Sequence, residues 1–130
     1  MSVIADTTIW VDYLRRGRSG RAAGLDDLLA RGEAVVCGPI VAEILAGASD
    51  RHRLELWSLF AGLPWVDLGR AQWRRVGEVA AALRDRGAAV PLTDIEIAVA
   101  AVDGGADVWT LDSDFDRIAS VLAELRRYAP

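Results

Sequence analysis

Four acidic residues stand within or directly beside predicted strands and helices. Asp6 follows an apolar segment near the N-terminus, Glu43 lies within a predicted helix, Asp94 opens another helix, and Asp112 follows a later apolar segment. Carboxylates that lie close together repel one another, and their pKa values rise unless a cation neutralises them. Hard cations such as Mg²⁺ and Mn²⁺ prefer oxygen ligands. If the fold brings these four residues together, we expect a divalent metal site.

The elements that must position these acids are short apolar strands alternating with helices. We expect strands at Ser2–Ala5, Val35–Cys37, Trp65–Leu68 and Val108–Leu111, with a weaker fifth within Leu125–Tyr128. Such alternation predicts one α/β domain over residues 1–130, in which a parallel sheet of four or five strands carries helices on both faces.

Glycine and proline residues mark where several of the predicted helices begin or end. We expect them over 9–14 (ended by Gly17), 25–29 (ended by Gly32), 39–45, 51–61, 70–86 and 95–102. The last of these is apolar on every side except at Glu96, as is typical of an enclosed helix. The core-facing residues of the fourth and fifth helices are expected to be Leu54, Trp57, Leu59 or Phe60, Trp73, Val76, Ala80 and Leu83.

A parallel sheet gathers the residues that follow its strands. Ligands bind outside the carboxyl ends of such strands, so Asp6, Asp112 and Asp114 share one edge if the first and fourth strands are neighbours. Asp94 then needs a helix N-terminus aimed at that edge, and Glu43 needs a helix crossing it. With two metal ions, such a site activates a water and stabilises the leaving oxygen of a phosphodiester. This chemistry is that of a nuclease.

Each acid also has a structural explanation. Asp94 complements a helix dipole, and Thr93 with Glu96 matches a capping box, so we assign Glu96 to capping. Asp6 stands where it could cap the helix that follows it. Glu43 stands where it could be a solvent-exposed residue of its helix. Asp112, Asp114 and Asp116 have the positions of caps for a short helix from Phe115, although three carboxylates within five residues exceed what capping requires.

The composition narrows the possible functions. The 130 residues are 52% hydrophobic and 26% charged, as expected of a globular domain. No apolar run is long enough to span a membrane, and no N-terminal signal indicates export. We therefore expect a cytosolic protein with no membrane partner. Cys37 is the only cysteine, and His52 the only histidine, standing beside Asp50, Arg51 and Arg53. Zinc chemistry and histidine-based acyl transfer are therefore disfavoured.

All 15 basic residues are arginines, and the net charge is -4. Phospho-receiver domains and haloacid-dehalogenase-like phosphatases also carry aspartates after parallel strands, but both need a lysine in the site, and this chain has none. Arg15, Arg16, Arg18 and Arg21 form a cluster that suits contact with a phosphate backbone, and a solvated helix end explains them equally well.

At the acidic residues the chain resembles the PIN-domain ribonucleases, specifically the VapC-type toxins of bacterial toxin-antitoxin pairs. The matching features run in the family's order along the whole chain: Ile4–Trp10; Pro39–Glu43 with Ile44, Leu45 and Gly47; Leu92–Asp94 with Ile97 and Ala98; and Trp109–Phe115. No single feature is specific, but the ordered set is.

The resemblance implies a three-layer α/β/α PIN-like domain with an acidic pocket that binds Mg²⁺ or Mn²⁺. By analogy the catalytic, metal-binding acids are Asp6, Glu43, Asp94 and Asp112, and Asp114 is an auxiliary ligand. Thr8 and Thr110 correspond to hydroxyl residues that hold carboxylates or waters in place.

The resemblance also implies partners. These are a single-stranded or looped RNA substrate, a cognate antitoxin whose C-terminal segment places an arginine near the acids, and a second copy of the chain. Trp10, Leu14 and Trp57 are the apolar residues that suit such protein contacts, although packing in the core also explains them. Two alternatives stay open: a PIN nuclease of RNA processing or decay, and a PIN-like module that binds without cutting.

Overall fold

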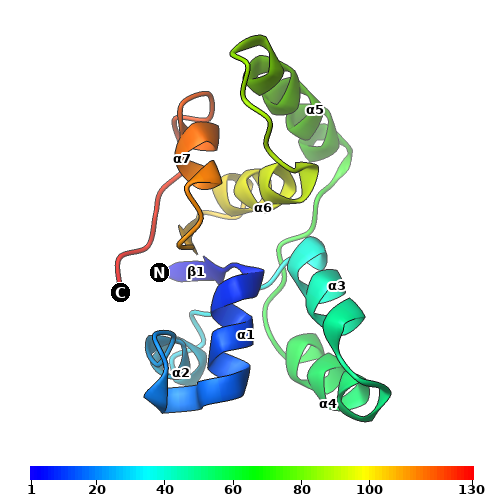
Figure 1. The fold of residues 1–130 in the computed structure, drawn as a ribbon, viewed down its shortest axis with the longest axis vertical. Helices are drawn as coiled ribbons and strands as arrows, with labels where there is room; N and C mark the ends of the chain where they lie inside the picture. The colour runs from blue at the N-terminus through cyan, green and yellow to red at the C-terminus, as the bar shows by residue number, and fades with distance from the viewer.

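A computed structural model describes residues 1–130 in full (Figure 1). In chain order the elements are β1 (Ser2–Ala5), α1 (Thr7–Arg16), the 3₁₀ turn η1 (Gly17–Ser19), α2 (Gly24–Ala30), α3 (Gly38–Gly47), α4 (Asp50–Ala61), α5 (Arg70–Asp85), α6 (Leu92–Asp103), β2 (Ala106–Trp109) and α7 (Asp114–Ala119). All six predicted helices are present, and α7 follows them.

The sheet is smaller than predicted. β1 and β2 pair in parallel, and their register sets Ala5 opposite Trp109. The other expected strands make only single parallel bridges, Val3 with Ala34, Val36 with Trp65 and Val108 with Arg127. A sheet of four or five full strands is therefore not confirmed. The segment after Ala34 has no room to extend, because α3 begins at Gly38 directly after Cys37.

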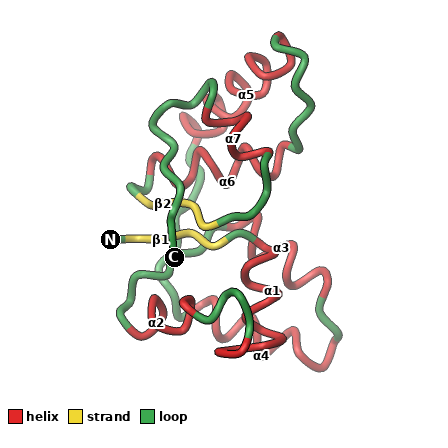
Figure 2. The backbone as a smooth tube through the Cα atoms, turned by 60° about the vertical axis from the view of Figure 1, so that its left-hand side comes forward, coloured by secondary structure: helices red, strands yellow, loops and turns green.

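Helices cover both sides of the strands. In both views α1 to α4 lie on one side of β1 and β2, and α5 to α7 lie on the other (Figures 1 and 2). The two chain ends lie near each other beside the strands. This arrangement leaves the carboxyl ends of β1 and β2 between the two groups of helices, where Asp6 and Thr110 follow the strands.

Helix α6 is the most enclosed helix, as its sequence predicted. Its buried residues include Ile95, Ile97, Ala98 and Val99, and it packs against α5 and β2. An enclosed helix cannot shift without disturbing the core, so its first turn, which carries Asp94, is held rigidly. None of the helices combines the length and apolar character needed to cross a membrane.

The buried side of α4 differs from the prediction. Phe60 is fully buried and packs edge to face on Trp10, with the ring centroids 5.1 Å apart. Leu56 packs on the core one turn earlier. At about 100° per residue, Leu54 falls opposite the face that carries Leu56 and Phe60, and Trp57 falls at the edge of that face. They are 74% and 46% exposed. Their predicted inward orientation is wrong. Trp10, for which both protein contacts and packing in the core were open, is fully buried in the core.

In α5 the buried residues are Val76, Val79 and Leu83. Trp73 was expected to face the core but is 52% exposed. It lies one turn before Val76, at the start of the helix, where the core no longer covers this face. The prediction for Val76 and Leu83 is confirmed, and that for Trp73 is wrong.

Candidate metal centre

The register of the two strands fixes the surroundings of Asp6. Because Ala5 pairs with Trp109, the Asp6 N–H donates to the Trp109 carbonyl at 2.9 Å, and Asp6 stands beside Thr110. The Thr110 hydroxyl donates to Oδ2 of Asp6 at 2.5 Å, and the Ile9 N–H donates to Oδ1 at 3.1 Å. Asp6 therefore caps α1 with one oxygen and is held by Thr110 through the other.

Burial of the Asp6 carboxyl raises its pKa. The hydrogen bonds from Thr110 and Ile9 act in the opposite direction, and the negative charge of Asp112 adds to the rise. Both oxygens of Asp6 are thus oriented by donors while the group stays costly to ionise. A nearby cation would favour its charged form.

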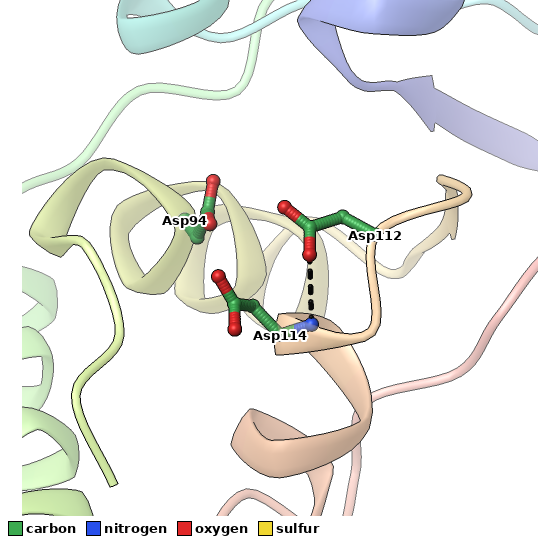
Figure 3. Close-up of side chains that lie close together, drawn as sticks. All are labelled: Asp94, Asp112 and Asp114. Carbon is green, nitrogen blue, oxygen red and sulfur yellow. Dashed lines mark hydrogen bonds between the residues drawn. The ribbon is translucent and has the colours of Figure 1, made fainter.

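The loop after β2 is held by its own side chains. Thr110 Oγ1 accepts from the Asp112 N–H at 3.0 Å, and Oδ1 of Asp112 accepts from the Asp114 N–H at 2.9 Å (Figure 3). Arg127, near the C-terminus, donates to the Thr110 carbonyl at 2.8 Å and to Asp116. These bonds set the positions of Asp112 and Asp114 relative to Asp6.

Asp94, Asp112 and Asp114 come together between α6 and this loop (Figure 3). Each offers one carboxylate oxygen, and these three oxygens lie within 4.8 Å of one another. Arg117 forms an ion pair with Asp114, with Nη1 and Oδ1 2.5 Å apart. Asp94 has no such cationic partner.

Among the three acids in this group, Asp94 has a pKa that its surroundings change strongly. Partial burial, followed by the negative charges of Asp112 and Asp114, raises the pKa of Asp94 from 3.8 to about 6. Glu43 and Asp6 act in the same direction with smaller effects. The other four predicted acids therefore all act on Asp94, although Asp6 and Glu43 lie outside the closest group of three.

Glu43 is positioned by a residue that sequence reasoning missed. The Thr7 hydroxyl donates to Oε1 of Glu43 at 3.0 Å, linking the first turn of α1 to α3. Thr8, which was expected to provide a supporting hydroxyl, is exposed and lines a hollow beside α1. The two threonines are adjacent and alike, so only the packing of α1 against α3 distinguishes them.

The assignment of Glu96 to helix capping is wrong. Helix α6 begins at Leu92 with Pro91 at its N-cap position, and no side chain caps it. The expected capping box of Thr93 and Glu96 would require the helix to begin later. Glu96 is instead half-buried, and burial and the charge of Glu43 raise its pKa. It therefore extends the negative region around Glu43.

The residues fit a divalent metal ion. Mg²⁺ takes oxygen ligands at about 2.1 Å, so opposite ligands of one ion lie about 4.2 Å apart. Neighbouring ligands lie about 3.0 Å apart, so three carboxylate oxygens within 4.8 Å of one another can reach one ion if the side chains close around it. The donor set is carboxylate only, which suits Mg²⁺ or Mn²⁺ and not zinc.

Helices on both sides of parallel strands, with carboxylates beyond the strand ends, define an α/β protein with an acidic pocket. The sequence model of the PIN domain matches residues 3–121, so the chain belongs to the PIN-domain family. Among proteins with curated functions, no significant match was found.

Solved structures show the same fold. A chain in the DNA-bound VapBC structure from Salmonella typhimurium is 19% identical with a TM-score of 0.78, and the match covers 98% of this chain and 97% of that one. A chain in the VapBC2 structure from Rickettsia felis, bound to a promoter DNA fragment, is 19% identical with a TM-score of 0.76 and 98% coverage of both chains. A chain in a toxin-antitoxin complex from Klebsiella pneumoniae is 18% identical with a TM-score of 0.66, covering 86% and 88%.

Proposed function

We propose that this PIN domain is a Mg²⁺- or Mn²⁺-dependent endoribonuclease that acts in the cytoplasm as the toxin of a toxin-antitoxin pair. The observation that carries the proposal is the group of Asp94, Asp112 and Asp114, with their oxygens within 4.8 Å of one another. The fold shared with chains of VapBC and other toxin-antitoxin complexes supports the toxin role.

In this proposal Asp94, Asp112 and Asp114 hold the metal, with Asp6 and Glu43 completing the acidic site. The metal supplies an activated water and charge stabilisation at the leaving oxygen of the phosphodiester. Thr110 and the N-terminus of α1 orient Asp6, and Thr7 orients Glu43. These donors fix the acids before substrate arrives, as preorganised catalysis requires.

The test is cleavage of single-stranded RNA by the purified protein. Cleavage is expected with Mg²⁺ or Mn²⁺, to disappear in chelator, and to return when the metal is restored. The Asp94→Asn variant is expected to be inactive, whereas Asp67→Asn removes the same charge from an exposed loop residue and is expected to keep activity. Cleavage that persists in chelator would refute the metal mechanism.

The role as a toxin needs a separate test in cells. Expression of the wild type alone is expected to arrest growth, and Asp94→Asn is expected to be harmless. Mapping of RNA ends after brief induction identifies the substrate. A wild type that cleaves RNA in vitro but leaves growth unaffected points to a role in RNA processing or decay.

We propose that the antitoxin occupies a groove between α1, α3 and α4. The groove has a volume of about 620 Å³, and its apolar lining includes Leu14, Ile44, Leu56 and Leu59. Glu43 lines the same groove, which links it to the acidic site. An amphipathic segment lying in the groove buries its apolar face and brings a basic side chain within reach of the acids.

The homodimer is proposed to form through the exposed apolar residues of α4, Leu54 and Trp57. Two variants separate the surfaces. Leu14→Asp is expected to weaken antitoxin binding without affecting self-association, and Leu54→Asp is expected to do the reverse. Calorimetry with the antitoxin and light scattering of the free protein are the measurements. Equal effects of both variants would contradict the assignment of two surfaces.

A further inference from the structure

A hollow of about 260 Å³ lies beside the acidic site, on the side of α1. The residues that line it are Thr8, Ile9, Asp12, Arg16, Arg21 and Leu111. Thr8 stands two residues after Asp6, and Leu111 separates Thr110 from Asp112. The hollow therefore adjoins both loops that carry the acids.

The arginines near this hollow differ in how far their charge is neutralised. Arg18 is bound by Asp26, with Nε and Oδ2 2.8 Å apart, and Arg15 lines the groove between α1, α3 and α4 instead. Arg16 makes only a 3.7 Å ion pair with Asp12, and Arg21 is exposed and forms no ion pair. The hollow thus has two arginines that are available to a ligand.

Asp12 is the one acidic residue in the hollow, and its carboxylate is already engaged. Oδ2 accepts from the Ala22 N–H at 3.0 Å, and Oδ1 is the oxygen that faces Arg16. The turn that carries Arg21 packs closely on this carboxylate, because a Cβ at Gly20 would lie 2.6 Å from Oδ2 of Asp12. Two arginines against one engaged carboxylate leave a net positive charge.

An RNA strand that approaches the acidic site requires positive charge nearby. RNA is a polyanion, the chain has a net charge of -4, and the acids repel each phosphate that approaches them. Arg117 also lies beside the acids, but its charge is paired with Asp114. Of the two arginines that line the hollow, Arg21 forms no ion pair and Arg16 makes only the 3.7 Å pair with Asp12, so both can compensate a phosphate there.

We propose that the hollow binds a backbone phosphate of the RNA strand next to the one being cut, with Arg21 as the main contact and Arg16 as the second. This inference rests on the proposed ribonuclease function. The Thr8 hydroxyl is a further donor for the phosphate oxygens, and Leu111, which is 63% exposed, offers apolar surface to the adjoining nucleotide. Contacts of this kind position a strand without reading its sequence.

The test measures binding of a fluorescent single-stranded RNA of mixed sequence in chelator, so that no cleavage occurs. Arg21→Gln is expected to weaken binding about five- to tenfold at low salt. It is also expected to reduce the slope of log K against log salt by about 0.7, the loss of one phosphate contact on a single strand. Arg84→Gln, at the far end of α5, removes the same charge and is expected to change neither quantity.

Cleavage assays with metal separate this proposal from the proposed function. If the wild type cleaves RNA, Arg21→Gln is expected to raise KM with little change in kcat, because Arg21 does not touch the scissile phosphate. Equal RNA affinity and salt slope for Arg21→Gln and Arg84→Gln would overturn the phosphate site while leaving the nuclease proposal intact. Binding that depends on Arg21 in a protein that never cleaves RNA would support the site and refute the nuclease.

Discussion

Replacing Asp94 by asparagine is expected to make the metal-free protein more stable and the metal-bound protein inactive. Asparagine has nearly the same shape as aspartate but no charge, so it removes the repulsion that Asp94 experiences from Asp112, Asp114, Glu43 and Asp6. No hydrogen bond contributes to the pKa of Asp94, so the substitution breaks none that favours the charged form. The change therefore removes both the cost of burying the charge of Asp94 and its repulsion by the other acids.

The size of the effect follows from the pKa. A rise from 3.8 to about 6 corresponds to roughly 3 kcal/mol. Asp94 is half-buried, and solvent screening reduces this to about 1–2 kcal/mol. For a domain of this size 1 kcal/mol shifts Tm by roughly 4 °C. We expect Asp94→Asn to raise the Tm of the metal-free protein by about 4–8 °C at neutral pH.

The pH dependence has a definite sign. The folded state binds the Asp94 proton more tightly than the unfolded state does, so the metal-free wild type gains stability as pH falls from above 6 toward about 4. In Asp94→Asn this contribution is absent. Calorimetric scans in chelator at pH 7 and pH 5 measure both effects, and Asp67→Asn serves as the control.

The same scans with Mn²⁺ complete the test. The wild type is expected to gain stability on adding the metal, because the ion binds only the folded state. Asp94→Asn is expected to lose most of this gain. A variant that is destabilised without metal, or that keeps the full response to Mn²⁺, would show that Asp94 is not part of a repulsive, cation-binding group.

Further predictions concern the supports of the site and the core. Thr110→Val is expected to lower the free energy of unfolding by about 1–3 kcal/mol in urea titrations, because the buried Asp6 loses a donor. Thr8→Val, at an exposed position, is expected to change it by less than about 0.5 kcal/mol, and equal losses would contradict the assigned hydrogen bond. Phe60→Ala is expected to cost about 3–5 kcal/mol because it empties the contact with Trp10, whereas Leu54→Ala is expected to be nearly neutral in the same titrations.

The helices could be predicted from the sequence because local signals mark their ends. Gly17 and Gly32 have φ values of 52° and 69°, a region that favours glycine, and they follow α1 and α2. Pro39 stands in the first turn of α3. The sheet was harder to predict, since an apolar segment does not reveal how many bonds it exchanges with its neighbour.

The candidate site was only partly predictable. The positions of Asp6 and Asp112 after strands suggested a common edge, and the parallel pairing of β1 and β2 supplies the physical reason that Asp6 meets Thr110. Which of two adjacent threonines supports Glu43 depends on how α1 packs on α3, and that information is not local. The same holds for Trp10, whose burial depends on Phe60, fifty residues later in the chain.

The long range of the contacts around Asp6 has a consequence for synthesis on the ribosome. Asp6 and its donor Thr110 are separated by 104 residues, and Arg127, which holds the Thr110 carbonyl, comes later still. A nascent chain therefore exposes its first acid long before the partners that orient it have been translated. Assembly of the acidic pocket waits until residue 127 has left the exit tunnel, so the proposed nuclease activity begins only after this part of the chain has been made.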